Sequence, residues 1–336
     1  MLRRITGHSG PDVMTDPFSL RVLALAGGVG GAKLAAGLSH LLKDRLTVLV
    51  NTGDDFEHLG LHISPDVDTV MYTLGGIANP QTGWGIAGET WDFIKQVEKL
   101  GGPGWFLLGD RDLATHVIRT ERLRRGESLT AITADLCGAL GISSRILPMT
   151  DDRIRTRVHS GDQILDFQHY FVCEKCALPV SRLTFDGAVQ ARFNAELHDL
   201  EKGIGPIAVI ICPSNPYLSI DPILSLPGLE EWLRRVPAVR LAVSPIVGGQ
   251  AIKGPAAKLM QELNINPSSA SVAKHYRGLI DGFVFDEVDK DLADQIAALD
   301  MVPLSTQTIM VEASDRVTLA RECIAFAERL LGRTGM

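Results

Sequence analysis

The stretch LRVLALAGGVGG, residues 20–31, decides the fold. Residues 20–26 are almost all apolar, as in a strand that is buried on both faces. Four of the next five residues, 27–31, are glycines, which let the backbone turn tightly and approach another group closely. Leucines at 34, 38, 41 and 42 then share one helical face, which predicts a helix over residues 32–42. The stretch therefore predicts a strand, a glycine turn and a helix.

The same alternation continues along the chain. Buried strands are predicted at residues 46–50, 207–212, 239–243 and 282–285, and helices at 66–74, 112–125, 129–140 and 315–331. Strands that alternate with helices favour a parallel sheet, in which the carboxyl ends of all strands lie at one edge. We expect the functional site in the loops that leave this edge.

Short alternating runs replace this pattern from residue 145 to about 193, and they include predicted strands at 156–159 and 163–171. The fold class expected is α/β: a Rossmann-like parallel-sheet core with an inserted smaller α+β subdomain. The core would comprise residues 19–140 and 205–332, and the insert 141–204. Residues 1–18, which carry no apolar segment typical of a signal peptide, are expected to be a flexible extension.

Composition excludes several classes of partner. The 33 basic and 40 acidic residues give a net charge of -7, so we expect no extended positive surface and no nucleic-acid partner. No apolar run reaches the roughly 18 residues that cross a bilayer, so no membrane partner is expected. The five cysteines lack the spacing of a secreted framework, which favours a reducing, cytoplasmic location. Cys173 and Cys176 form an isolated C-x-x-C, which we interpret as two ordinary thiols.

The glycine turn is suited to binding phosphate. Backbone amides at Gly28, Gly30 and Gly31, together with the positive end of the following helix, can hold an anion, and Lys33 can add a charge. The motif is not a Walker loop, and Lys33 stands where G-x-G-x-x-G has its third glycine. The turn therefore predicts a nucleotide site, with a tight turn that binds nothing as the alternative.

Carboxylates gather soon after the glycine turn. Asp54 and Asp55 follow the second strand about where a dinucleotide-binding fold has its ribose-binding acid, so NAD is one interpretation. Asp66 and Asp68 follow closely, and several carboxylates beside a phosphate site are typical of Mg²⁺ binding. We choose Asp54 and Asp68 as the metal ligands. Asp66 could instead serve the start of a helix, and Asp55 could be solvated surface.

Two further polar groups are candidates. Arg111, within the sequence GDRD at 109–112, can hold a phosphate or carboxylate through two hydrogen bonds. His116, one turn after Asp112, is interpreted as structural. PSNP at 213–216 and SP at 244–245 both follow buried strands, so they can form a rigid polar edge for a base or ribose.

Together these motifs resemble the CofD family, the 2-phospho-L-lactate transferases, in order from about residue 22 to 330. The residues that carry the resemblance are 27–34, 51–55, 64–72, 109–112, 146–152, 213–216, 244–246 and 253–256. The resemblance implies a homodimer with a Rossmann-like core. The donor would be a guanylyl-linked phospho-acid, carrying lactate, enolpyruvate or glycerate. The acceptor would be the deazaflavin FO, 7,8-didemethyl-8-hydroxy-5-deazariboflavin, whose ribityl hydroxyl attacks the phosphorus while GMP leaves, in coenzyme F-420 biosynthesis.

The resemblance also implies a role for each matched residue. Asp54 and Asp68 would bind Mg²⁺ near the acceptor hydroxyl, with Asp68 as the candidate general base, and Arg111 would lie near the acceptor or the donor's acid group. The nucleotide would be held by the diphosphate-binding Gly28, Gly30, Gly31 and Lys33, by Asn51, Thr52 and Asp55, and by Ser214, Asn215 and Ser244 at the guanosine.

Two other classes of function remain open from the sequence. A YvcK-type regulator would share the glycine turn but would bind a nucleotide sugar without catalysis. Trp84 and Gly85, which could supply an aromatic face to a tricyclic acceptor, and the 110–112 group disfavour it. An NAD-dependent oxidoreductase is disfavoured by Lys33 in the third-glycine position.

Overall fold

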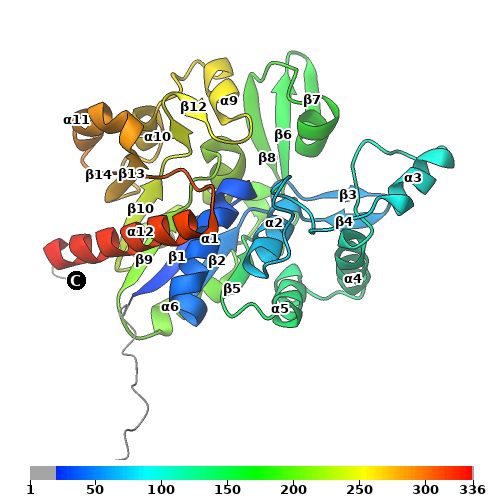
Figure 1. Ribbon diagram of the computed structural model, residues 1–336, viewed down its shortest axis with the longest axis horizontal. Helices are drawn as coiled ribbons and strands as arrows, with labels where there is room; N and C mark the ends of the chain where they lie inside the picture. The colour runs from blue at the N-terminus through cyan, green and yellow to red at the C-terminus, as the bar shows by residue number, and fades with distance from the viewer. Residues whose placement is uncertain (1–19, 335–336) are drawn as a thin grey trace, which may run out of the picture.

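The computed structural model describes residues 20–334, so the predicted extension, residues 1–18, lies outside the described residues. The centre of the described structure is a seven-stranded parallel sheet in the order β14-β13-β10-β9-β1-β2-β5 (Figure 1). Its strands are β1 (Arg21–Ala26), β2 (Leu46–Val50), β5 (Arg145–Pro148), β9 (Ile207–Ile211), β10 (Ala238–Val243), β13 (Gly282–Asp286) and β14 (Val302–Thr306). The Rossmann-like parallel sheet predicted from the sequence is confirmed.

The direction in which the sheet grows reverses between β1 and β9. From β1 the chain adds β2 and β5 on one side, and after the intervening segment it returns to pair β9 with the other side of β1. In such sheets the loops after the two central strands diverge and leave a crevice where ligands bind. The loop after β1 is the glycine turn, and the loop after β9 contains Pro213–Asn215, so the fold brings two predicted motifs together.

Apolar residues cover both faces of the sheet. Val22, Ala24 and Ala26 of β1 pack into a cluster with helices on one face, whereas Leu23 and Leu25 belong to a second cluster on the other. The first face is covered by α1 (Gly28–Leu42), α2 (Pro65–Leu74), α5 (Leu129–Ala139) and α12 (Ala313–Thr334). The second is covered by α8 (Leu229–Arg235), α9 (Ala256–Glu262), α10 (Ser269–His275) and α11 (Ala293–Ala297). Such near-continuous apolar strands are typical of parallel sheets with two covered faces.

Smaller elements complete the described chain. The remaining helices are α3 (Asp92–Lys99), α4 (Asp112–Arg124), α6 (Asp199–Lys202) and α7 (Asp221–Leu224). Two hairpins are formed by β3 (Phe56–His58) with β4 (Leu61–Ile63), and by β11 (Ile246–Val247) with β12 (Gln250–Ala251). Each predicted helix is present, but α1 begins at Gly28, inside the glycine turn, and so earlier than the predicted Ala32.

The predicted insert differs from the expectation in two ways. Its antiparallel sheet is β7-β6-β8, formed by β6 (Arg155–Ser160), β7 (Gln163–Asp166) and β8 (Arg182–Asp186), beside the large sheet (Figure 1). β5, within the predicted range 141–204, instead pairs with β2 as the edge of the large sheet, because its residues 146–148 are buried. The strand predicted for 163–171 ends at Asp166, since Phe167 and Tyr170, one helical turn apart, are both buried.

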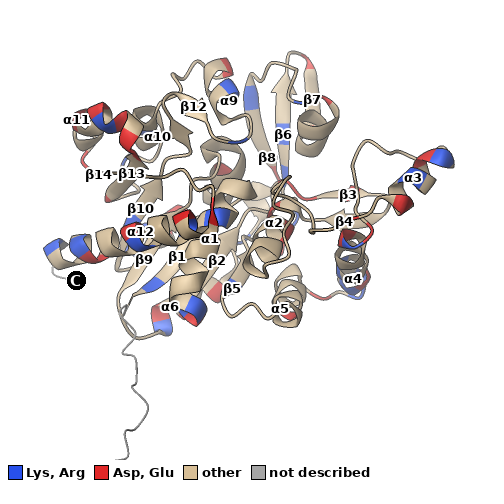
Figure 2. Cartoon of the chain, viewed as in Figure 1, with Lys and Arg blue, Asp and Glu red and all other residues tan. Residues whose placement is uncertain are grey.

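Charges of both signs are spread over the outer helices, notably α3, α4 and α12 (Figure 2). Within residues 20–334, no helix combines the length and the apolar composition that a membrane span needs.

Candidate active site

The glycine turn is locked against the loop after β9. The Ser214 hydroxyl donates to the Gly27 carbonyl at 2.8 Å and accepts from the Gly27 amide at 3.1 Å. A Cβ on Gly30 would clash with the Pro213 carbonyl oxygen, and one on Gly31 with the Ser214 hydroxyl. Glycine is needed here because two backbones touch. The first-turn amides of α1 thus lie beside the loop after β9, and amides at such a helix end have no acceptor within the helix.

Asp66 occupies part of this helix end. Its Oδ1 accepts from the Gly28 amide at 2.7 Å, and its Oδ2 accepts from Asn51 Nδ2 at 2.9 Å. Gly28, predicted to contact the diphosphate, thus gives its amide to Asp66. Asn51 is itself held in place, since its Oδ1 accepts from the Gly53 amide at 2.8 Å. Asn51 therefore links the loop after β2 to α2 and the glycine turn.

Three buried carboxylates, Asp54, Asp55 and Asp66, lie close enough for their charges to interact. Burial raises the pKa of Asp54 well above its usual value, and repulsion by Asp66 and Asp55 raises it further. Burial also raises the pKa of Asp66 to about 6, against the hydrogen bonds from Asn51 and Gly28. Oδ1 of Asp54 and Oδ1 of Asp55 have no hydrogen-bond partner among residues 20–334. A divalent cation such as Mg²⁺ prefers oxygen ligands, and buried oxygens without partners beside like charges are suited to it, so Asp54 and Asp55 are the residues that could hold one.

Asp55 is buried, so the alternative of a solvated surface acid does not hold. Its Oδ2 accepts from the Ser64 hydroxyl at 2.5 Å and lies 3.0 Å from His62 Nε2. The hydroxyl of Thr52 is buried in the same loop and also lacks a partner among the described residues. The loop after β2 therefore offers polar atoms that a ligand can engage.

Asp68 belongs to a different network. Its two oxygens accept from Nη1 and Nη2 of Arg119, the former at 3.0 Å, and His116 Nδ1 lies 3.7 Å from Oδ2. His116 Nε2 lies 3.3 Å from Asp112 Oδ1, which also accepts from the Tyr72 hydroxyl at 2.5 Å. Burial raises the pKa of Asp68, and the charges of Arg119 and His116 oppose that shift.

Asp66 and Asp68 are two positions apart on α2, so their side chains leave opposite sides of the helix. Asp66 turns toward the glycine turn, and Asp68 toward α4. The predicted metal ligands Asp54 and Asp68 consequently have separate partners. Asp68, Asp112 and His116 do place ligand atoms within 4.8 Å of one another, a second arrangement able to hold a metal ion.

Cations lie on the other side of the glycine turn. Lys33 Nζ donates to the Met310 carbonyl at 2.5 Å, and burial lowers its pKa, with a further contribution from the positive charges of Arg316 and Lys253. Lys253 Nζ donates to the Thr82 carbonyl at 2.8 Å. Arg111, by contrast, is exposed, and its Nη1 donates to the Ala87 carbonyl at 3.0 Å.

The three residues predicted to contact guanosine differ in whether they have a hydrogen-bonding atom that the protein does not use. Asn215 Oδ1 accepts from the amides of Tyr217 and Leu218, and its Nδ2 is buried without a partner among the described residues. The Ser244 hydroxyl donates to the Ile246 carbonyl and accepts from the Ile246 amide, so its own turn uses it. Ser214 is likewise occupied by Gly27. Asn215 is thus the member of this group with an unused buried donor.

Sequence reasoning missed Asp66 and Arg119 as site residues. Asp66 looked like a helix-start acid, yet no side-chain cap bond forms at Ser64, and the carboxylate reaches Gly28 instead. Arg119 was not among the predicted residues. Its signal was the spacing of Asp112, His116 and Arg119, which places all three on one face of α4.

Comparison with known proteins follows the same motifs. The profile of the family described as 2-phospho-L-lactate transferase CofD matches residues 22–322. A phosphoenolpyruvate transferase of Streptomyces coelicolor is 38% identical over 319 residues, 93% of this chain and 99% of that protein. A 2-phospho-L-lactate transferase of Methanosarcina mazei is 39% identical over 277 residues, 82% of this chain and 89% of that protein.

A solved structure of a UPF0052-family protein from Bacillus halodurans has a similar fold, with a TM-score of 0.59 at 14% identity over 91% of this chain and 98% of that one. That identity supports the fold alone. The sequence relatives carry the assignment, and they confirm the resemblance predicted from the motifs. The chain therefore belongs to the CofD family, the family of 2-phospho-L-lactate transferases.

Proposed function

We propose that this CofD-family transferase moves a phospho-three-carbon-acid group from a guanylyl diphosphate carrier to FO in coenzyme F-420 biosynthesis. An oxygen–phosphorus bond forms between the terminal ribityl hydroxyl of FO and the phosphorus that bears the acid. The bond from that phosphorus to the bridging oxygen breaks, GMP leaves with the electron pair, and the hydroxyl loses its proton. The observation that carries the proposal is the glycine turn, which Ser214 joins to the β9 loop and Asp66 joins to the buried carboxylates.

The chain's own residues bind and orient the donor. Amides of Gly30 and Gly31 at the first turn of α1 bind the diphosphate, with Lys33 and Lys253 neutralising its charge. Transfer of this kind depends mainly on positioning and charge neutralisation. Mg²⁺, when bound, would neutralise charge on the phosphate oxygens, and the partnerless oxygens of Asp54 and Asp55 support a site beside Asp66.

The role of Asp68 as metal ligand or general base stays a prediction. Both oxygens of Asp68 accept from Arg119, so its contacts favour a positioning role over proton abstraction. Asp68→Asn is expected to abolish turnover while the fold persists. Wild-type turnover in Asp68→Asn would remove any role for this carboxylate in the reaction.

A reconstituted assay tests the function. The chain is mixed with FO, Mg²⁺, GTP, a guanylyltransferase and, in separate reactions, phospholactate, phosphoenolpyruvate or phosphoglycerate. A new acidic deazaflavin, identified by mass, is expected with one of them, and its mass names the acid. Failure with all three acids, together with tight binding of a nucleotide sugar or NAD, would contradict the proposal.

We also propose a cytoplasmic homodimer. All five cysteines are free thiols, as in a reducing compartment. Leu107, Val117 and Ile118 are exposed apolar side chains on or just before α4, which supports contact with a second copy there. Light scattering that gives the mass of one chain at assay concentration would contradict the dimer.

A further inference from the structure

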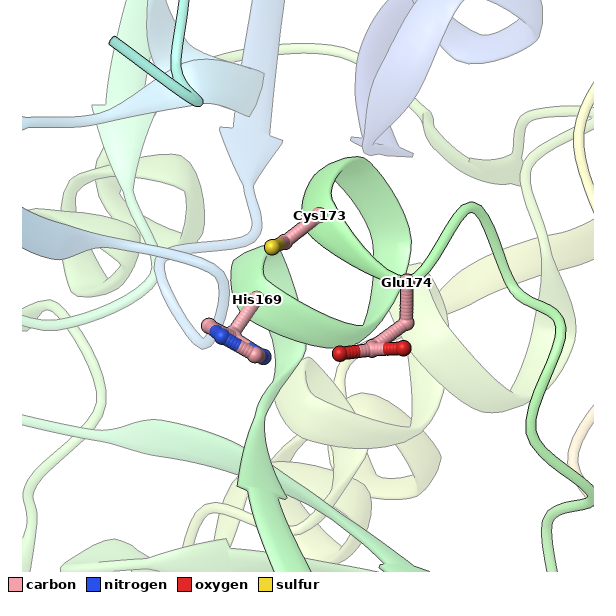
Figure 3. Close-up of side chains that lie close together, drawn as sticks. All are labelled: His169, Cys173 and Glu174. Carbon is pink, nitrogen blue, oxygen red and sulfur yellow. The ribbon is translucent and has the colours of Figure 1, made fainter. Parts of the chain in front are cut away.

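We propose that His169, Cys173 and Glu174 form a binding site for a zinc ion, separate from the nucleotide site. One atom from each side chain, an imidazole nitrogen, the thiol sulfur and a carboxylate oxygen, lies within 4.8 Å of the other two. Figure 3 shows the three side chains on one turn of helix, with the carboxylate of Glu174 directed toward the His169 ring.

The donor atoms select the metal. Nitrogen, sulfur and oxygen from these three residue types are the ligands of protein-bound zinc, whereas Mg²⁺ prefers oxygen alone. With bonds of roughly 2.0–2.3 Å in a tetrahedral site, ligand atoms lie about 3.4–3.7 Å apart. Side-chain torsions that move the ligand atoms by about 1 Å would bring the present arrangement, within 4.8 Å, to that spacing. The site is therefore nearly formed before an ion binds.

The backbone explains why these residues meet. His169–Cys173 forms a π-helical turn, η2, in which the Glu174 amide donates to the His169 carbonyl at 3.0 Å. This wide turn brings positions 169, 173 and 174 to one side, and π turns often mark functional sites. Lys175 and Cys176 then adopt left-handed backbone angles, with φ of 50° and 56°, so the chain leaves the helix directly after Glu174.

The two cysteines of the C-x-x-C pair lie in different surroundings. Cys176 is partly buried near the Tyr170 side chain, whereas Cys173 is exposed beside His169 and Glu174. Both are free thiols. Cys173 is thus the ligand, and Cys176 offers a matched cysteine that is not.

An unused atom supports the site. His169 Nδ1 is buried and has no hydrogen-bond partner among residues 20–334. An ion held through Nδ1 would supply that partner, and buried polar atoms rarely lack one. The Trp105 ring packs near the imidazole, with the two ring centroids 6.0 Å apart. Three protein ligands leave the fourth zinc position to water.

Cobalt, which reports thiolate ligation by its absorption, tests the site. The full chain, stripped with a chelator, is titrated with Co²⁺ in excess Mg²⁺, which occupies oxygen-only sites. We expect a near-ultraviolet thiolate-to-cobalt band that saturates at one equivalent and is abolished by one equivalent of Zn²⁺. His169→Ala and Cys173→Ser should lose the band, and Cys176→Ser should keep it, while far-ultraviolet circular dichroism stays unchanged in all three.

Glu174→Gln should keep the band but weaken cobalt affinity at least tenfold, because a neutral amide replaces the carboxylate. The proposal is overturned if the wild-type chain gives no thiolate band. It is equally overturned if Cys173→Ser retains the band, or if Cys176→Ser loses it, because the thiolate would then come from another cysteine.

Discussion

At the scale of single residues, buried charge is the main feature of the site. One buried carboxylate is paired with a cation of the protein, and two others are not. Asp68 is neutralised by Arg119, which is itself 0% exposed. Asp54 and Asp66 interact with Asn51, and Asp66 also accepts from the Gly28 amide, but neither has such a cation beside it among residues 20–334. Arg119 therefore stabilises the charge of Asp68, whereas the charges of Asp54 and Asp66 require a bound cation or ligand for comparable stabilisation.

Arg119→Met should be strongly destabilising, because it leaves the Asp68 carboxylate buried without its partner. A loss of about 3–5 kcal/mol in the free energy of unfolding is expected. Arg125→Met, at the C-terminal cap of the same helix but 69% exposed in an ion pair with Glu121, should cost less than about 0.5 kcal/mol. Urea unfolding measures both. Adding Asp68→Leu to Arg119→Met should restore part of the loss, and equal effects of the two arginine variants would contradict the argument.

The two ends of the Asn215 amide allow its helix-capping role to be tested separately from its proposed contact with the ligand. Asn215→Asp keeps the oxygen that accepts from the amides of Tyr217 and Leu218, but it replaces the partnerless Nδ2 donor by an acceptor. Stability should therefore change little, whereas affinity for guanosine and for GMP should fall about tenfold, the equivalent of one hydrogen bond.

Calorimetry with both ligands checks this. Weaker binding of GMP alone would indicate phosphate repulsion and contradict a contact with the nucleoside. Asn215→Ala, which also loses the cap, should in addition cost about 1 kcal/mol of stability.

At the scale of elements, the parts that local sequence determines were predictable, and the contacts between distant parts were not. The apolar runs at 20–26 and 46–50 and the leucines of α1 specify their elements by periodicity alone. The bonds from Asp66 to Gly28 and from Asp68 to Arg119 span 38 and 51 residues. The two-residue spacing on α2 already directs these aspartates to opposite sides, but which neighbouring element each one meets follows only from the fold.

The contact between the glycine turn and the β9 loop gives an element-scale prediction. Gly30→Ala would push its Cβ into the Pro213 carbonyl, so one loop must move. Stability should fall by about 1–3 kcal/mol, and donor affinity should fall at least tenfold. Gly138→Ala, within α5 with open space around the new Cβ, should instead raise stability by roughly 0.5–1 kcal/mol. Thermal unfolding and steady-state kinetics of the two variants test the pair, and full activity in Gly30→Ala would exclude a close contact there.

At the scale of the whole molecule, the insert and the parallel sheet share one hydrophobic core. Ile154, Val158 and Leu197 of the predicted insert belong to the same buried cluster as Leu23 and Leu25 of β1. The short alternating runs of sequence predicted a separate subdomain, because they replaced the helical pattern of the core. Continuity of the core depends on side chains far apart in sequence, so it became visible only in the fold.

A shared core means that the insert and the sheet should unfold together. Ile154→Ala empties a site that is 1% exposed in this cluster and should cost about 2–5 kcal/mol. The whole chain should still unfold in one transition, shifted to lower urea concentration. Ile164→Ala makes the same change on β7, where the side chain is 62% exposed, and should cost less than about 1 kcal/mol.

Tryptophan fluorescence and far-ultraviolet circular dichroism should give coincident curves for both variants, because Trp232 lies in the common cluster. An early, separate transition in Ile154→Ala alone would show that the insert unfolds independently. In that case the shared cluster would be a surface between two domains, and the site at the glycine turn would survive loss of the insert's structure.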